Sequence, residues 1–416
     1  MFERSIPEWL RHPPAAAAHR PGIRAFATLS GVEVMIRGTL LSVFPLAMYG
    51  ALGDARAVST VYFGVGLASL TTGMLLPWVN RRIPRRWLYS LGASLYALGG
   101  ICGTMGGLWI VAALIACTLA TVTCFICLNA YVLDYVSKND LGRTETLRMF
   151  YSALSWTAGP VTGVALWNLW PALPFLICIG FAGVLLAVFW ALRLGNGKLI
   201  QRARQPAPNP LAYLGRFLKQ KRLIGGWLFA VMRSCGWWGY IVYLPLYAIE
   251  NGLPEGLGGT LVSMTNGFLF VSPLMLRWVQ RTSVRTAVRC GFACAALGFG
   301  LAALSPAPAL AVACLFLASG FLILLDISGG LPFLMAVKPS ERTEMAAIYS
   351  SFRDVSGILT PGVAALVLLV APIQGIFAVV GAGLFGMFLL SGRLHPMLGV
   401  APNQRHPRRP PARNSA

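Results

Sequence analysis

Residues 108–135 read LWIVAALIACTLATVTCFICLNAYVLDY, a run of 28 residues with a single charged side chain, Asp134. An α-helix needs about 20 apolar residues to cross the hydrocarbon core of a bilayer, whereas a strand of a membrane barrel needs only about 10. In hydrocarbon the backbone must satisfy its own polar groups, which a helix does within one segment. The run therefore predicts a membrane-spanning helix.

Eleven further apolar runs extend this prediction to most of the chain. Hydrophobic residues make up 56% of the 416 residues, charged residues make up 11%, and the mean hydropathy is +0.68. Such a composition lies outside the range of ordinary soluble domains. The twelve predicted spans cover residues 25–48, 58–79, 87–105, 108–135, 149–167, 173–192, 223–249, 257–279, 287–304, 309–337, 345–370 and 373–390.

The net charge of +21 arises from 34 Lys and Arg residues whose placement is one-sided. The N-terminal tail, the segments after spans 2, 4, 6, 8 and 10, and the C-terminal tail, together with Arg277 and Arg289 at the adjoining span ends, hold 30 of them, while the opposite segments hold only Arg56. Positive segments stay on the cytoplasmic side of a membrane. The pattern predicts a multi-pass protein of the inner membrane with both termini in the cytoplasm. Because the charges form no basic groove, nucleic acid is not an expected partner.

A basic, proline-rich segment divides the spans into two sets of six. Residues 193–222 hold eight Lys and Arg residues and the stretch QPAPNP at 205–210, a composition typical of a linker. We therefore expect a cytoplasmic N-tail at 1–24, an N-terminal six-helix bundle at 25–192, the cytoplasmic linker at 193–222, a C-terminal six-helix bundle at 223–392 and a cytoplasmic tail at 393–416.

The two sets of spans are related by an internal repeat with an offset of 200 residues. Pro45-Leu46 matches Pro245-Leu246, and PWVNR at 77–81 matches RWVQR at 277–281. Repeats related by an axis along the membrane normal are common in transporters. The predicted fold is an all-α integral membrane protein of twelve transmembrane helices in two pseudo-symmetric six-helix bundles.

These features resemble the major facilitator superfamily over the whole chain apart from its tails. The family's loop 2–3 pattern, Gly-x-x-x-Asp-Arg-x-Gly-Arg-Lys, aligns with GMLLPWVNRR at 73–82. Gly73, Arg81 and Arg82 fit this pattern, but Pro77 stands where the family has its acidic residue. The resemblance implies a structural or gating role for the three matching residues.

A second motif lies in the fifth predicted span. Gly159, Pro160 and Gly163 are similar to the core of the motif in the family's drug and metabolite antiporters, which implies export. The alternative is that they only kink the helix and allow close packing. The family's arginine motif in the fourth span is missing, because residues 108–133 contain no basic residue. In that respect the chain departs from the common multidrug exporters.

Six charged side chains are predicted to lie within spans, where a charge is costly unless it is paired or hydrated. They are Glu33, Arg37, Arg233, Asp326, Arg353 and Asp354. The resemblance implies that spans 1, 4, 7 and 10 line a central cavity, so the first four are the predicted substrate and proton-coupling residues. Arg353 and Asp354, nearer the cytoplasmic surface, are predicted structural or gating residues. The alternative for the whole set is ion pairs that only hold helices together.

The spacing of these residues suggests how they pair. Glu33 and Arg37 are four residues apart and share a helix face. Glu33 and Arg233 occupy matching positions of the repeat, so we expect them to pair across the two halves when the protein is closed toward the cytoplasm.

Polar and aromatic side chains complete the candidate substrate site. Trp237 and Tyr240 follow Arg233 at near-helical spacing, and Trp237 is in reach to stack on Arg233. Asn129 and Asn266 are further cavity candidates. The alternative for the aromatic residues is that they face lipid or pack between helices.

The sequence lacks the patterns of an enzyme, a cofactor site or a metal centre. It contains no nucleotide-binding loop, and its four His residues lie in the tails. Cys124 and Cys127 are interpreted as small packing residues.

The leading hypothesis is therefore proton-coupled export of a small organic solute by a protein that acts as a monomer in the lipid bilayer. Glu33 or Asp326 would carry the proton, while Arg37 and Arg233 would bind an anionic group. One alternative is proton-linked uptake of an organic anion. Another is a protein of the same fold that does not transport and acts as a membrane assembly factor or receptor.

Overall fold

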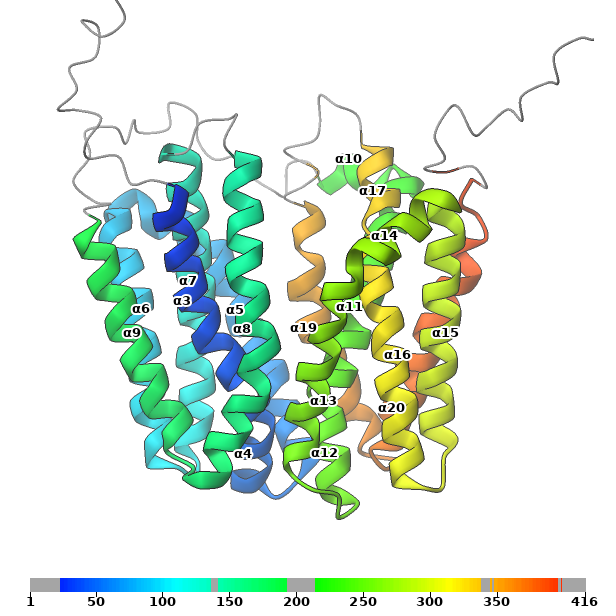
Figure 1. Ribbon diagram of the computed structural model, residues 1–416, viewed down its shortest axis with the longest axis horizontal. Coiled ribbons are helices and arrows are strands. Elements are labelled where there is room, and N and C mark those ends of the chain that lie inside the picture. The colour runs from blue at the N-terminus through cyan, green and yellow to red at the C-terminus, as the bar shows by residue number, and fades with distance from the viewer. Residues whose placement is uncertain are drawn as a thin grey trace, which may run out of the picture.

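The computed structural model describes residues 23–135, 141–192, 214–337, 345, 348–395 and 398, and its regular elements are helices (Figure 1). Among these residues, six single helices are long and apolar enough to cross a membrane, and α3 with α4, bent by 41°, makes a seventh span. The remaining spans are interrupted or carry more polar residues. The tails and residues 193–213 of the predicted linker lie outside the described ranges.

The helices form two bundles that stand side by side (Figure 1). The first bundle contains α3 (Ile23–Leu41), α4 (Val43–Leu52), α5 (Ala55–Arg82), α6 (Arg85–Met105), α7 (Trp109–Tyr135), α8 (Leu141–Leu169) and α9 (Leu173–Ala191). The second contains α10 (Leu214–Leu218), α11 (Lys221–Ile241), α12 (Tyr243–Glu250), α13 (Gly256–Gly267), η2 (Phe268–Val271), α14 (Ser272–Arg281), α15 (Val284–Leu304), α16 (Pro308–Ser328), α17 (Leu331–Ala336), α19 (Phe352–Val367) and α20 (Gln374–Ser391). The predicted two-bundle fold is confirmed.

The internal repeat is also seen in the positions at which two spans break. The first span breaks between α3 and α4 at Ser42, and the seventh breaks between α11 and α12 at Val242, which is the same 200-residue offset. Proline lacks the N–H that would bond to the carbonyl four residues earlier and its ring crowds that carbonyl. Pro45 and Pro245 lie three residues beyond the two breaks and account for both.

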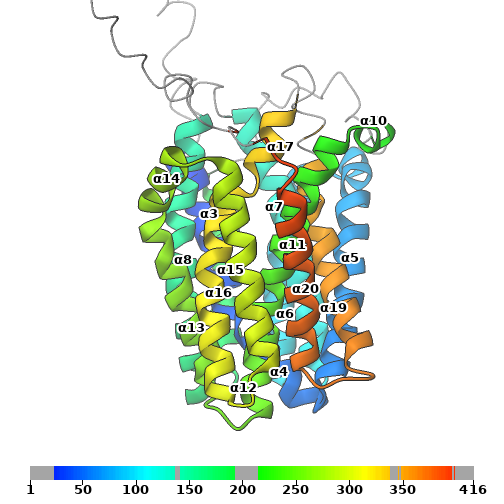
Figure 2. The same ribbon diagram turned by 90° about the vertical axis from the view of Figure 1, so that its right-hand side faces the viewer.

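We call the face of the molecule on which α3 begins and α20 ends the termini face. The two bundles contact each other toward the opposite face. At the opposite face, α4 packs against α12, and the Tyr243 hydroxyl donates a 3.0 Å hydrogen bond to Ser59 of the other bundle. Toward the termini face, α14 packs against α15 and α16 of its own bundle. The ribbons of the two bundles correspondingly spread apart on that side (Figure 1), and Figure 2 shows the second bundle from its outer side.

Small residues allow close packing within and between the bundles. A Cβ on Gly159 would lie 2.5 Å from the carbonyl carbon of Gly38, and one on Gly163 would overlap the Thr39 carbonyl, so α8 lies directly against α3. On the other side of α8, a Cβ on Gly259 of α13 would lie 2.9 Å from the Pro160 carbonyl oxygen. The glycine and proline motif therefore supports the close packing that we considered as its alternative role.

Candidate functional site

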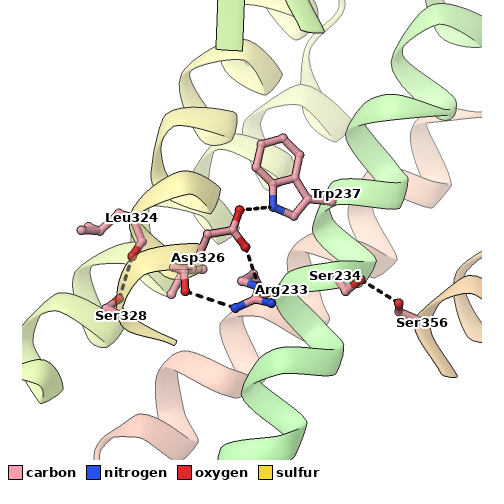
Figure 3. Close-up of polar contacts among 8 residues, drawn as sticks. Arg233, Ser234, Trp237, Leu324, Asp326, Ser328 and Ser356 are labelled. Carbon is pink, nitrogen blue, oxygen red and sulfur yellow. Dashed lines mark hydrogen bonds and ion pairs between the residues drawn. The ribbon is translucent and has the colours of Figure 1, made fainter. Parts of the chain in front are cut away.

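An ion pair and a hydrogen bond join α11 to α16 (Figure 3). Arg233 Nε lies 2.9 Å from Asp326 Oδ1, and Trp237 Nε1 donates a 3.0 Å hydrogen bond to Asp326 Oδ2. Both carboxylate oxygens are thus engaged from α11, one helical turn apart. The Asp326 side chain is still 39% exposed, whereas Arg233 is 10% exposed. Asp326 is therefore fixed in place but open to water or solute.

Arg233 is held on three sides. Besides the ion pair, its Nη1 donates a long 3.5 Å hydrogen bond to the Leu325 carbonyl, and its guanidinium lies over the Phe352 ring at 5.2 Å. The expected stacking on Trp237 is replaced by this contact with Phe352, because the Trp237 indole turns its N–H to the carboxylate. Phe352 also has Arg353 over it at 5.6 Å. Both guanidinium groups therefore contact the same aromatic ring.

The first bundle holds a second charged group on α3. Arg37 Nη1 lies 3.6 Å from Glu33 Oε1, which confirms that the two residues share a helix face. Tyr96 of α6 donates a 3.0 Å hydrogen bond to the same Glu33 oxygen, and its hydroxyl also lies 2.8 Å from that of Thr121. Glu33 is only 3% exposed, whereas Arg37 is 33% exposed. The carboxylate is enclosed in the bundle and the guanidinium reaches its edge.

Arg37 also contacts an aromatic residue of its own bundle. It lies over the ring of Trp156 in α8 at 5.2 Å, and the Trp156 carbonyl is hydrogen-bonded by a side chain of the second bundle. Arg37 is also close enough to Arg353 of α19 for their charges to repel. Arg37 thus lies against a residue whose carbonyl contacts the second bundle.

In this structure Arg233 pairs with Asp326 and Glu33 pairs with Arg37, so each of these two ion pairs lies within one bundle. The cross-bundle pair of Glu33 with Arg233 is not formed here. We expected that pair in a state closed toward the cytoplasm, whereas here the bundles spread apart at the termini face, so for the closed state it stays a prediction.

Asn266 makes a contact between the two bundles. Proline cannot donate a backbone hydrogen bond, so Pro160 leaves the Trp156 carbonyl without its helical partner. Asn266 Nδ2 of α13 donates a 2.8 Å hydrogen bond to that carbonyl, and the Val161 N–H donates a 2.9 Å hydrogen bond to Ser263 Oγ. Asn266 therefore joins the two bundles through its amide.

The matching interface of the repeat uses glycine instead. Pro361 in α19 leaves the Gly357 carbonyl without its helical partner, and Gly66 of α5, which matches Asn266 at the offset of 200, lies against that oxygen. A Cβ at Gly66 would lie 2.7 Å from it. One interface is thus closed by an amide hydrogen bond and the other by close backbone approach.

The other candidate residues are placed as follows. Tyr240 is fully buried in the second bundle, where its hydroxyl lies 2.8 Å from that of Thr265, so it packs in the core. Asn129 in α7 and Asp354 in α19 are half-buried, and a Cβ on Gly73 in α5 would lie 3.8 Å from Val122, an ordinary van der Waals contact. Arg82 is exposed and lies over Trp78 at 4.2 Å. The side chain of Arg81 lies outside the described residues.

Comparison with known proteins identifies the family of this chain. The family model described as Major Facilitator Superfamily matches residues 26–329. The chain belongs to the major facilitator superfamily. It is accordingly a multi-pass membrane transporter and not an enzyme. No curated protein sequence matches the chain.

Solved structures of facilitator transporters share its fold. A mutant form of the nucleoside transporter NupG is similar with a TM-score of 0.71 and 14% identity over 89% of this chain and 98% of that one. A POT family transporter in complex with 5-aminolevulinic acid gives 0.68 and 13% over 89% and 95%. A bacterial homologue of the iron transporter ferroportin gives 0.64 and 16% over 90% and 99%. At such identities the likeness shows the fold alone.

Several residues of the site escaped the sequence reasoning. Tyr96, Trp156 and Phe352 contact the charged residues, yet each is an aromatic residue in an apolar run, and no pattern marks Tyr96. Phe352 had one signal, its position next to Arg353. For Trp156, the position four residues before Pro160 indicated a free carbonyl.

Proposed function

We propose that the chain is a proton-coupled exporter of a small organic solute that works as a monomer by alternating access in the inner membrane. The observation that carries this proposal is the Arg233–Asp326 pair, which lies within spanning helices of a facilitator transporter with its carboxylate 39% exposed. A charge at such depth is costly and usually marks a substrate or ion pathway. A pair that served packing alone would gain nothing from leaving its carboxylate open.

Asp326 is the better placed of the two candidate proton carriers. Glu33 is enclosed and bonded by Tyr96, whereas Asp326 combines exposure with an arginine that holds its charged form. A carboxylate that loses an arginine partner in a nonpolar setting takes up a proton more readily. Arg233 would act as the switch, because arginine itself stays charged. Movement of α11 relative to α16 would then couple proton uptake to the change of state.

The orientation of the protein in the membrane and the direction of solute transport are inferred from different features. The placement of 30 of 34 Lys and Arg residues supports a cytoplasmic termini face, which is the face on which the bundles spread apart. Export is supported by the similarity of Gly159, Pro160 and Gly163 to the antiporter motif. Membership of a transporter family weighs against a non-transporting assembly factor or receptor.

Uptake of an organic anion is the second candidate function. Arg37 is 33% exposed and Arg353 is exposed on α19, so these two arginines are open to a solute, whereas Arg233 is occupied by Asp326. An anionic solute would be attracted to them. Direction of transport separates this candidate from the first.

A reconstitution experiment tests the function. A thermal-shift screen of the purified protein would first select solutes that bind. Proteoliposomes with an internal pH indicator would then receive each solute on one side. We expect the solute gradient to move protons, with opposite signs for antiport and co-transport. Solute flux without any proton movement would contradict the coupling, and absence of flux for every bound solute would contradict transport.

A further inference from the structure

The termini end of α5 carries a stacked arginine and tryptophan that the proposed transport function does not use. Arg82, the last residue of the helix, is exposed, and its guanidinium lies 4.2 Å from the centre of the Trp78 ring. Trp78 is itself 50% exposed. A guanidinium that rests on an indole face keeps the N–H donors at its edge available to a further group.

This stacked pair lies on the outer side of α5. A Cβ on Gly66 would lie 2.7 Å from the Gly357 carbonyl oxygen of α19, so the Gly66 side of α5 faces the second bundle. At 3.6 residues per turn, Trp78 and Arg82 point about 120° and about 160° away from Gly66. Figure 2 shows α5 at an outer edge of the molecule. The pair therefore faces the surrounding membrane.

Exposed apolar side chains continue this face toward the middle of the membrane. Leu67, Met74 and Leu75 are 42%, 56% and 58% exposed. At a rise of 1.5 Å per residue, the distance from Leu67 to Trp78 along the helix is about 16 Å, roughly half of the hydrocarbon core. The face thus offers the length of one acyl chain and ends at a tryptophan, a residue type that is enriched at the level of the lipid headgroups.

The positive charge at this end of α5 has little compensation from acids. The stretch RRIPRR at 81–86 holds four arginines, and residues 55–133 contain no Asp or Glu. Pro77 stands where the loop 2–3 pattern has its acidic residue. Arg82 makes no ion pair with any residue that the structure describes, whereas Arg85 lies over the Tyr131 ring inside the bundle at 5.2 Å. A phosphate group at Arg82 would supply the missing negative charge.

We propose that Trp78 and Arg82 bind one anionic phospholipid of the leaflet at the termini face. The Arg82 guanidinium holds the headgroup phosphate, Trp78 supports the guanidinium, and an acyl chain lies along Leu75, Met74 and Leu67. A zwitterionic lipid fits less well, because its ammonium group would be repelled by the arginines at 81–86. This inference goes beyond the proposed transport function and does not depend on the solute, its direction or its coupling.

Native mass spectrometry of the purified, full-length protein in detergent tests the site. The probes are phosphatidylglycerol and phosphatidylethanolamine with identical acyl chains, and soluble glycerol 1-phosphate serves as a competitor. The variants are Arg82→Gln, Arg82→Lys and Trp78→Leu. Arg281→Gln is the matched control, because Arg281 is an exposed arginine that ends α14, and none of the described aromatic rings lies under its guanidinium. Trp278→Leu is the control for the tryptophan, since Trp278 is 39% exposed.

We expect the wild type to bind phosphatidylglycerol at least about fivefold more tightly than phosphatidylethanolamine, the effect of about one basic residue beside an anionic headgroup. Arg82→Gln should abolish this preference, and Arg82→Lys should keep part of it. Trp78→Leu should weaken phosphatidylglycerol binding about two- to fivefold, as for loss of an exposed cation–π contact. Both controls should bind as the wild type does. Thermal unfolding of each variant without added lipid should match the wild type, because both side chains are exposed.

Three results would overturn the site. Equal binding of the two lipids by the wild type would exclude recognition of the anionic headgroup. An equal loss in Arg281→Gln and Arg82→Gln would show only a general attraction of the basic face for anionic lipid. Competition by glycerol 1-phosphate at the concentration of the lipid itself would indicate a site for free phosphate, and a lipid-free dimer in the wild type would indicate that a second copy covers this face.

Discussion

Replacing Asn266 by leucine should weaken the contact between the two bundles by a predictable amount. The change keeps the size of the side chain but removes the amide that donates a 2.8 Å hydrogen bond to the Trp156 carbonyl. Pro160 has no N–H to offer instead, so the carbonyl loses its partner. A buried polar group left without a hydrogen bond costs about 1–3 kcal/mol. We expect a loss of this size in the free energy of unfolding, measured in mixed micelles.

The same reasoning predicts a rescue. In Pro160→Ala, residue 160 regains an N–H that can donate to the Trp156 carbonyl, so the amide of Asn266 becomes dispensable. Asn266→Leu should then cost much less in the Pro160→Ala background than in the wild type. Asn129→Leu provides the control, because Asn129 is also half-buried and donates no hydrogen bond that we describe. If Asn266→Leu costs the same in both backgrounds, Asn266 does not stabilise the protein through this carbonyl.

Two further predictions concern topology and the central ion pair. Cysteines introduced near Gly106 or Pro308 should react with an impermeant label from outside the cell, whereas one at Arg281 should react only after permeabilisation; the opposite pattern would refute the orientation. Arg233→Ala should lower the free energy of unfolding by up to about 3 kcal/mol. This is the low end for a broken buried ion pair, because Asp326 is partly exposed. The double exchange Arg233→Asp with Asp326→Arg should restore part of the lost stability. If the exchanged protein is no more stable than Arg233→Ala, the ion pair between residues 233 and 326 does not stabilise the fold.

The helices and their repeat could be predicted because lipid imposes a simple rule. Each span must supply about 20 apolar residues, and the prolines that break two of them recur at the same offset. The helices extend past some predicted spans: α5 runs over Ala55–Arg82, whereas the apolar run covers 58–79. Asp54 caps its start by accepting the N–H groups of Arg56 and Ala57. An apolar run marks only the part in hydrocarbon, and capping groups extend the helix into the interface.

The charged residues of the site could be found from the sequence, but their partners could not. A charge inside a span is conspicuous because of its cost, and four-residue spacing was enough to pair Glu33 with Arg37. Pairing between helices depends on which helices are neighbours and on their rotation. Matching positions in the repeat suggested Glu33 with Arg233, whereas α16 in fact supplies the partner of Arg233.

Asn266 illustrates the same limit in another way. The sequence shows that Pro160 must leave a carbonyl free, and it shows a polar amide in another span. Nothing in the order of residues says that these two groups meet, since they lie 110 residues apart and in different bundles. Its prediction as a cavity residue followed from polarity alone, and the structure places its amide in a contact between the bundles.

Flux through reconstituted Asp326→Asn protein tests the central claim most directly. Asparagine keeps the size of the side chain and an oxygen for Arg233 or Trp237, but it cannot titrate. With a solute that the wild type transports, the variant should lose flux driven by a pH gradient yet keep exchange between equal solute pools, because exchange needs no net proton movement. Asp54→Asn, which keeps its capping capacity at the far end of α5, should retain both activities. If Asp326→Asn and Glu33→Gln both show wild-type flux driven by the pH gradient, neither carboxylate carries the coupling proton.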